Sequence, residues 1–288
     1  MADQLSYEER HASAAESFQI FAPGADPARV ADALGRRQGA LGAMAFDVVG
    51  AMWARPELSR RDRSLLVIST LAAQARDEEL VLHTRIGLRN GLTREEIEEA
   101  LLHVAAYAGY PAAMAASRKV DQGLREELGV EQLPDRAPAA KKSDAERDRD
   151  GASVLTTIGG ASGGPLAPEQ GLQRMQAMLG EVGVTAYRWA FGEIWSRDQL
   201  SRRDRSIVVI AILVAQGCVA ELDVHAAASL RHGLTRVEVE EIVNHLSLYA
   251  GIPRAVEAIR AVRASFAKLD GAKLDGADLA GAKPEAAE

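Results

Sequence analysis

The sequence predicts an all-α protein of two tandem helical domains that are related by an internal repeat. The segment LSRRDRS at 58–64 recurs unchanged at 200–206, and the offset of 142 then holds without a gap from Trp53/Trp195 to Val120/Val262. About half of the aligned residues are identical. Apolar residues recur with helical spacing in both copies, and no segment shows sustained strand alternation between hairpin turns. These observations indicate two copies of one helical fold.

Each helix of the repeat has its own signal. Residues 64–75 are apolar almost all round, which is typical of a buried central helix. A second helix is expected over 79–90, ending at the Asn90-Gly91 pair. Residues 93–96, TREE, have capping-box spacing and open a third helix, as 235–238 do in the second copy. Gly109 and Pro111 predict the end of this helix and the start of another.

These signals divide the chain into four parts. We expect a first domain over 1–132 and a second over 171–266. Residues 133–170 are rich in charge, Gly, Pro and Ser, and are predicted to form a linker with little core of its own. Residues 267–288 are low in complexity and are predicted to be a disordered tail.

Composition argues against several classes of function. The 288 residues contain 34 Lys+Arg and 41 Asp+Glu, a net charge of −7, which makes nucleic acid and anionic membranes poor partners. No apolar run reaches membrane-spanning length, and the N-terminus is charged where a secretory signal needs an apolar core. A single cysteine, Cys218, excludes an internal disulfide and a thiolate zinc site within one chain. We therefore expect a cytoplasmic protein.

The first candidate catalytic pair is a glutamate four residues before a histidine. Glu79 and His83 are matched by Glu221 and His225, and on a helix such residues share a face. A carboxylate beside imidazole favours the protonated ring, so each pair can supply a general acid. The alternatives are an exposed helix pair or a histidine satisfied in the core. A metal site needs further ligands, and each domain offers few, so we expect no metal.

A second pair lies on the helix that the capping box opens. His103 and Tyr107 are matched by His245 and Tyr249, near one edge of the apolar stripe. They can face a crevice or simply bond a neighbouring carbonyl. His232 stands where the first copy has Asn90, and an imidazolium that caps the helix explains it.

The arginines of the RRDR segments are open to two interpretations. Arg61, Arg63, Arg203 and Arg205 flank a helix start and alternate with aspartates. Solvated ion pairs account for them. Alternatively, a planar guanidinium reaches into the site and holds a substrate carboxylate in a bidentate pair.

At these residues the chain resembles the carboxymuconolactone decarboxylase family, which shares its fold with alkyl hydroperoxidase D. The resemblance rests on RRDRS, on ELVLH and ELDVH, and on the segments from NGLTREEI and HGLTRVEV to the YAG turn before proline. It covers about half of the chain strongly. These motifs specify the family well and its substrate poorly, because the family is functionally mixed.

The resemblance implies a cofactor-independent carboxy-lyase of aromatic catabolism that acts on 4-carboxymuconolactone or a related carboxylated unsaturated lactone. His225 or His83, oriented by Glu221 or Glu79, would deliver a proton. His245 or His103 would donate to the developing enolate oxygen, with Tyr249 or Tyr107 as partner, and an RRDR arginine would hold the carboxylate. Family members assemble through their helical lobes, so we expect a homo-oligomer, a trimer or a dimer of two-lobed chains.

Other functions remain open. The same carbanion chemistry can serve an isomerase, cyclase or decarboxylase on a different substrate, and a non-catalytic assembly or ligand-binding protein can retain the fold. The peroxidase branch of the family uses a Cys-x-x-Cys pair, at positions that hold Arg76 and Glu79 in one copy and Cys218 and Glu221 in the other. A two-cysteine peroxidase is therefore contradicted.

Overall fold

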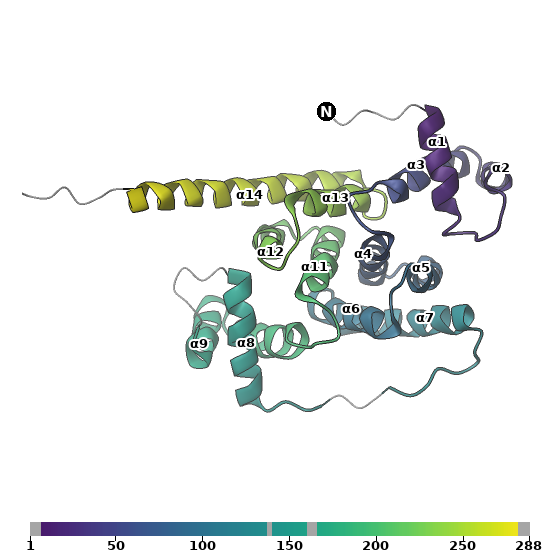
Figure 1. Cartoon of the computed structure of the whole chain (residues 1–288). Helices are drawn as coiled ribbons and strands as arrows, with labels where there is room; N and C mark the ends of the chain where they lie inside the picture. The colour runs from purple at the N-terminus through teal and green to yellow at the C-terminus, as the bar shows by residue number, and fades with distance from the viewer. Residues whose placement is uncertain (1–6, 137–139, 160–165, 282–288) are drawn as a thin grey trace, which may run out of the picture.

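The computed structural model describes residues 7–136, 140–159 and 166–281 (Figure 1). Regular structure in these ranges is helical throughout, which confirms the all-α prediction. The first repeat comprises α1 (Tyr7–Phe18), α2 (Pro27–Gln38), α3 (Ala40–Ala54), α4 (Arg60–Ala73), α5 (Asp77–Arg89), α6 (Arg94–Tyr107) and α7 (Tyr110–Leu128). The second comprises α8 (Asp144–Gly159), α9 (Pro168–Leu179), α10 (Glu181–Thr185), the π-helix η1 (Ala186–Trp195), α11 (Arg202–Gln216), α12 (Val219–Arg231), α13 (Arg236–Leu246) and α14 (Ile252–Gly281).

The expected helix boundaries follow from local hydrogen bonds. The Ser59 hydroxyl accepts from the Asp62 backbone N–H and begins α4, and Ser201 begins α11 in the same way. Both predicted capping boxes are complete, at the starts of α6 and α13. Gly109, with φ 98°, turns the chain between α6 and α7 because a residue with a Cβ is disfavoured there.

The repeat extends further toward the N-terminus of each copy than the sequence predicted. The supposed linker contains α8, whose Ala152, Val154 and Ile158 are buried against η1 and α12. That prediction is wrong because a segment rich in charge can still carry one apolar stripe. α8 packs on η1 as α1 packs on α3, and α9 begins with a proline as α2 does. The second repeat therefore begins at α8.

A single inserted residue explains the π-helix. Gly42 and Gly183 each approach the preceding helix, and Phe46 and Tyr187 are buried, so these counterparts lie 141 residues apart. From Trp53 and Trp195 onward the offset is 142. The extra residue lies between these points, where the second repeat has η1. A π-helix absorbs one added residue while it keeps the residues on either side in register, so Trp195 stays equivalent to Trp53.

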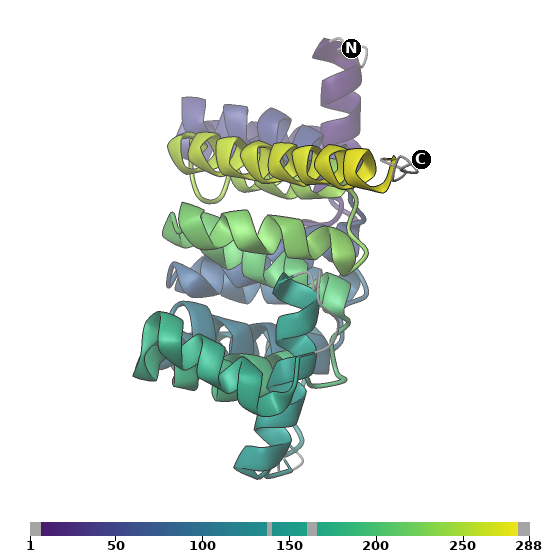
Figure 2. The ribbon, with the colours of Figure 1, turned by 90° about the vertical axis from the view of Figure 1, so that its left-hand side faces the viewer.

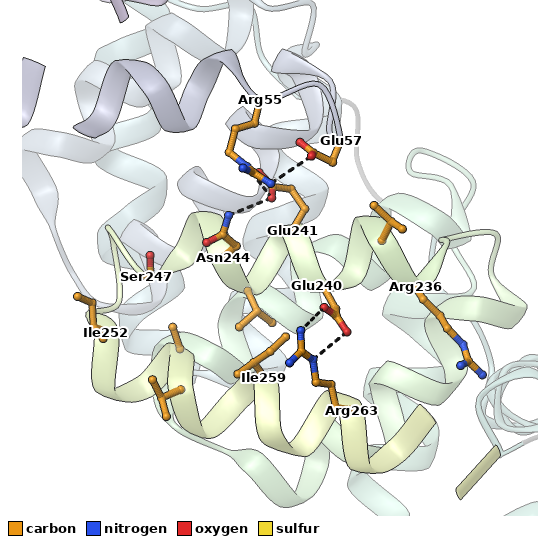
Figure 3. A pocket seen from close by; sticks show the side chains of 14 residues that line it. Arg55, Glu57, Arg236, Glu240, Glu241, Asn244, Ser247, Ile252, Ile259 and Arg263 are labelled. Atoms are coloured by element: carbon orange, nitrogen blue, oxygen red, sulfur yellow. Dashed lines mark hydrogen bonds and ion pairs between the residues drawn. The ribbon is translucent and has the colours of Figure 1, made fainter. Parts of the chain in front are cut away.

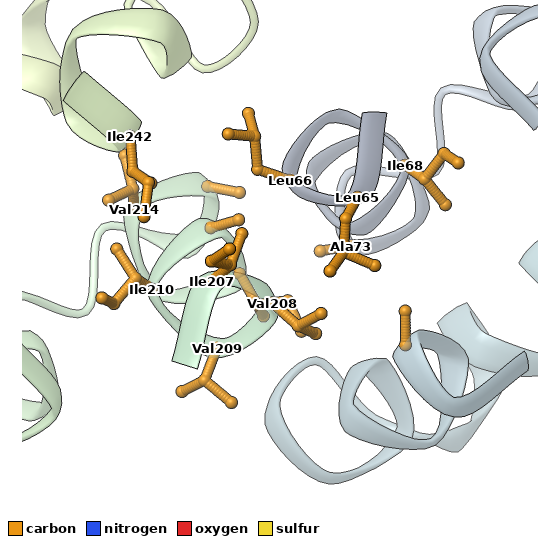
Figure 4. Packing of buried hydrophobic residues seen from close by; sticks show 14 of the residues in the cluster. Leu65, Leu66, Ile68, Ala73, Ile207, Val208, Val209, Ile210, Val214 and Ile242 are labelled. Carbon is orange, nitrogen blue, oxygen red and sulfur yellow. The ribbon is translucent and has the colours of Figure 1, made fainter. Parts of the chain in front are cut away.

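The two repeats share one hydrophobic core. α4 and α11 pack against each other near its centre (Figure 4), and their side chains from Leu65 to Leu71 and from Ile207 to Val214 are almost all buried. In Figure 2 helices of the first repeat lie beside helices of the second, and α11 and α13 contact α6 and α4 respectively. The predicted lobes are therefore packed into one body.

Charged residues also join the repeats. The Arg203 guanidinium donates to both carboxylate oxygens of Asp62, at 3.1 and 3.0 Å, and Arg61 donates to Asp204 at 3.0 Å. Arg61 also pairs with Glu96, and Arg203 with Glu238. Each ion pair made by one repeat thus has a counterpart made by the other, so the starts of α4 and α11 are arranged with approximate twofold symmetry.

The predicted tail is helical in its described part. α14 continues to Gly281 and extends past the other helices in Figure 1. Lys268 pairs with Asp223 and Asp270 with Arg236, so charged residues of the low-complexity segment dock on α12 and α13. The disorder prediction is wrong for 267–281, because this segment continues a helix that begins at Ile252 and its first residues form ion pairs with α12 and α13. Residues 282–288 lie outside the described ranges. No described helix has the length and apolar character to cross a membrane.

Candidate functional site

Four predicted catalytic residues, all histidines, gather in two composite sites, each built from both repeats. The first composite site takes a tryptophan, an arginine and a histidine from the first repeat, and a glutamate, a histidine and a tyrosine from the second: Trp53, Arg63, His83, Glu241, His245 and Tyr249. The second composite site has the counterparts at an offset of 142: Trp195, Arg205, His225, Glu99, His103 and Tyr107. Histidines of one repeat thus belong to different sites.

A tryptophan and a tyrosine join the repeats in each site. The Trp53 indole N–H donates to the Tyr249 hydroxyl at 3.0 Å, and Trp195 donates to Tyr107 at 2.9 Å. The Tyr107 oxygen also lies 3.4 Å from Nε2 of His225. Burial raises the pKa of both tyrosines. Each tyrosine therefore stays protonated and keeps one O–H to donate beside a histidine.

The first histidine of each site is buried and neutral. Burial lowers the pKa of His83 from 6.5 to about 3 and the pKa of His225 to about 4. Glu79 and Glu221 are exposed, and no described hydrogen bond joins either glutamate to its histidine. The expectation that these carboxylates favour an imidazolium is wrong, because the cost of desolvating a charged ring exceeds any gain from the glutamates. The Glu79 charge does help raise the pKa of Tyr249.

The second histidine of each site is fixed by a buried arginine. Nη1 of Arg63 lies 2.7 Å from Nδ1 of His245, and Nη1 of Arg205 lies 3.0 Å from Nε2 of His103. A guanidinium can only donate, so the facing ring nitrogen must be an unprotonated acceptor. Each ring is then neutral with its N–H on the opposite nitrogen, in agreement with the lowered pKa of both histidines caused by burial.

That opposite nitrogen has no partner. Nε2 of His245 and Nδ1 of His103 are buried and bond to none of the described residues. Buried donors are rarely left unpaired in proteins, because an unmade hydrogen bond costs about 1–3 kcal/mol. The arrangement therefore holds a ready N–H donor inside each site.

A buried glutamate balances each arginine. Arg63 donates to Glu241 at 2.9 Å and Arg205 to Glu99 at 3.0 Å, and neither arginine has an exposed side chain. A half-exposed arginine pairs with the other side of each glutamate: Arg55 with Glu241 and Arg197 with Glu99. Each carboxylate thus accepts from two guanidinium groups.

The four candidate arginines of the RRDR segments therefore lie in two environments. Arg63 and Arg205 enter the composite sites and contact histidines, whereas Arg61 and Arg203 lie in the ion-pair network between the repeats. All four guanidinium groups bind protein carboxylates. Both interpretations from the sequence were incomplete, since neither included buried arginines that act on a histidine.

Sequence reasoning missed two pairs of site residues. Trp53/Trp195 and Glu99/Glu241 are identical between the copies and buried, and that identity was the available signal. Phe21 was missed because it has no such counterpart; its ring contacts Trp53 and His83 edge-on, with centroids at 5.6 and 5.9 Å.

The second composite site has His232 beside Trp195, where the first repeat has Asn90. His232 lies 2.8 Å from the Ser206 hydroxyl through Nδ1 and 3.2 Å from the Thr157 hydroxyl of α8 through Nε2. It forms the C-cap of α12, as expected. Burial lowers its pKa to about 4, so the predicted capping imidazolium is wrong. Its counterpart Asn90 donates to Ser64.

The buried histidines predict that folding stability falls below about pH 6.5. Between 6.5 and the folded-state pKa values of about 3 for His83 and about 4 for His225, the unfolded chain binds protons that the folded chain does not. The stabilisation is complete above pH 6.5 and is lost as the pH falls, by up to about 1.4 kcal/mol per pH unit for each histidine. Urea unfolding between pH 4.5 and 7.5 measures it.

The control for this prediction is the variant His83→Gln/His225→Gln, which retains every carboxylate. Its free energy of unfolding should change less steeply with pH over the same range. Equal slopes for the two proteins would contradict neutral burial of these rings.

Cys218 is half-buried at the start of α12. Within the described ranges, no cluster of three or more His, Cys, Asp or Glu residues is arranged to hold a metal ion.

Comparisons with known proteins agree with the resemblance seen in the sequence. A model of the carboxymuconolactone decarboxylase family matches residues 39–122 and 182–264, one region in each repeat. The chain is 43% identical over 82 residues to a 4-carboxymuconolactone decarboxylase of Acinetobacter baylyi, which covers 28% of this chain and 61% of that protein. It is 34% identical over 71 residues to a nitrosuccinic acid decarboxylase of Metarhizium robertsii, covering 25% and 50%.

A third relative, an uncharacterised 15.0 kDa protein of Paracoccus denitrificans, is 23% identical over 101 residues, covering 34% of this chain and 75% of that protein. The matches to the two decarboxylases span only about half to three-fifths of their length. The family regions together cover more than half of this chain and contain all twelve residues of the two composite sites. The chain is therefore a member of the carboxymuconolactone decarboxylase family, with two copies of its domain.

Proposed function

We propose that this protein is a cofactor-independent decarboxylase whose substrate is 4-carboxymuconolactone or a related carboxylated unsaturated lactone. The observation that carries the proposal is the unpaired, buried imidazole N–H that an arginine fixes in each composite site. The decarboxylases among its relatives support the reaction class. Both composite sites have the same six residue types, so we assign activity to both.

The reaction needs a donor for developing negative charge. When the bond from the ring carbon to the carboxylate breaks, CO₂ leaves and the electron pair moves through the alkene to the lactone carbonyl oxygen. The N–H of His245 or His103 donates to that oxygen. A preorganised donor in a water-poor site is a large source of transition-state stabilisation, worth about 3–4 kcal/mol where one such donor is removed.

The dienolate then takes a proton on carbon. His83 or His225 is neutral, so one ring nitrogen can give up its proton only as the other takes one. The hydroxyl of Tyr107, 3.4 Å from Nε2 of His225, is placed to supply that proton, and water restores it to the tyrosine. Tyr249 holds the same position relative to His83, with ring centroids 5.4 Å apart.

The surroundings favour loss of the carboxylate. Trp53, Phe21 and their neighbours present aromatic surface. A charged carboxylate is poorly solvated beside such a surface, whereas neutral CO₂ loses little solvation free energy there, so the surroundings favour decarboxylation. Arg63 and Arg205 act as positioning residues in this mechanism, because each fixes the tautomer of a histidine. Glu79 and Glu221, exposed one helical turn before His83 and His225, lie at the edge of the sites rather than inside them.

Turnover of freshly generated 4-carboxymuconolactone tests the proposal. We expect the metal-stripped wild type to release CO₂ and form the enol lactone, and Tyr107→Phe/Tyr249→Phe to lower kcat by about a hundredfold or more, since the proton relay is lost. Tyr110→Phe, at an exposed tyrosine, should leave kcat unchanged. A folded wild type without turnover would reject this substrate.

A second substrate is favoured by one comparison. The relative named nitrosuccinic acid decarboxylase would send the electron pair released with CO₂ to a nitro oxygen, which needs the same kind of N–H donor. Nitrosuccinate therefore belongs in the same assay. Absence of turnover for both acids would favour a non-catalytic, ligand-binding member of the family.

A further inference from the structure

The strongest unexplained feature is a groove between α13 and α14, about 640 Å³ in volume (Figure 3). Its apolar lining includes Val237, Ile252 and Val256, which are 61%, 67% and 38% exposed. Arg263 pairs with Glu240 at its rim, at 3.0 and 2.7 Å. None of these five residues belongs to a composite site, although Glu241 of the first composite site and its partner Arg55 also line the groove. Exposed apolar side chains around a concave surface indicate a binding site.

The first repeat shows what fills the equivalent groove. After α7 the chain turns at Gly129, with φ 66°, and runs back without regular structure along α6 and α7. Leu133 packs against the core, Arg94 donates to the Pro134 carbonyl at 2.9 Å, and Arg136 donates to Glu98 and Asp121 at 2.9 and 2.7 Å. This extended segment covers one end of the first groove.

The second repeat has the groove but not the segment. Gly271, the counterpart of Gly129, lies inside α14, which continues as a helix to Gly281. The groove of the second repeat is also more apolar, since Glu95 is replaced by Val237 and Ser117 by Ile259. Arg136 binds two carboxylates in the first repeat; Glu98 is matched by Glu240, but Asp121 is replaced by Arg263, so one of the two negative charges becomes positive.

We propose that the α13/α14 groove binds an extended peptide segment of a partner protein, with an apolar residue followed three positions later by a carboxylate. The apolar side chain takes the place of Leu133, over Val237 and Ile259. The carboxylate takes the place of Arg136 and pairs with Arg263. This binding is independent of the proposed decarboxylation.

The chain itself supplies the probes. Two blocked octapeptides are made from residues 129–136: GVEQLPDR, and its acidic form GVEQLPDE with Arg136→Glu. Titration of the full chain, followed by calorimetry and by the methyl resonances of valine and isoleucine, gives the affinity and the location. We expect the acidic peptide to bind several-fold more tightly, since an exposed ion pair contributes up to about 1 kcal/mol. Replacing leucine by alanine in the peptide should weaken binding about tenfold or more.

Two variants transfer residues of the first repeat to the second. Arg263→Asp should reverse the preference, so that GVEQLPDR binds more tightly than GVEQLPDE. Val237→Glu/Ile259→Ser should abolish binding of both peptides while turnover remains at the wild-type value, and a circular dichroism melt confirms that this variant is folded.

Three results would overturn the proposal. The first is no binding of either peptide at millimolar concentration. The second is binding that Arg263→Asp and Val237→Glu/Ile259→Ser leave unchanged. The third is self-association of the wild type that Val237→Glu removes without peptide, because a second copy of the chain would then occupy the groove.

Discussion

His83→Ala/His103→Ala is expected to lower turnover to about 1% of wild type or less, whereas His83→Ala/His245→Ala should keep about half. Both variants lose two buried histidines. The first pair comes from one repeat but disables both composite sites; the second pair comes from both repeats but disables one site. A general acid contributes about 10²- to 10⁴-fold to a rate, so a disabled site should contribute almost nothing.

Steady-state kinetics on whichever acid the wild type decarboxylates measures this difference, with circular dichroism melts to confirm folding. His225→Ala/His103→Ala is the matched control and should also keep about half, because it disables only the second composite site. Retention of activity by the same-repeat pair, with loss in the same-site pair, would show that each repeat forms its own site.

Glu241→Met is expected to lower the free energy of unfolding by about 3–5 kcal/mol, because Arg63 would remain buried without a countercharge. Arg63 is fully buried and donates to Glu241 at 2.9 Å. Arg63→Met/Glu241→Met removes both charges, so it should cost less than Glu241→Met alone. Chemical denaturation of the three proteins measures the coupling between the two side chains.

The neighbouring residue is the control. Glu240 forms an ion pair with Arg263, but their side chains are 36% and 66% exposed. Glu240→Met should therefore cost no more than about 1 kcal/mol. Equal losses for Glu240→Met and Glu241→Met would mean that the buried pair is not the source of the stability.

Most of the fold could be predicted from local patterns. The capping boxes at Thr93 and Thr235, the glycine turn at Gly109 and the apolar helix of the RRDRS segment each depend on residues close in sequence, and all appear as expected. α8 was not predicted because its stripe of Ala152, Val154 and Ile158 is short and lies in a charged, glycine-containing segment. Only contact with η1 and α12 identifies that stripe as core.

The sequence predicted most of the residues of the candidate sites, but it did not predict which residues of one repeat lie beside which residues of the other. Spacing places Glu79 and His83 on one helix face, but it does not say what the face meets. The structure puts Tyr249 and His245 beside His83, and Tyr107 and His103 beside His225. No pattern within one repeat predicts this exchange, because it depends on how α13 packs on α4 and how α6 packs on α11.

By itself, the sequence determined the helices from the RRDRS segment onward in each copy, the duplicated domain, the family and the identity of the histidines, tyrosines and RRDR arginines. These follow from short-range geometry and from comparison of one repeat with the other. Only the tertiary structure decided that each site is shared between repeats, that Arg63 and Arg205 fix histidine tautomers, and that His83 and His225 are neutral. The physical reason is that partner and protonation state depend on burial and on atoms contributed by distant segments, which local spacing does not specify.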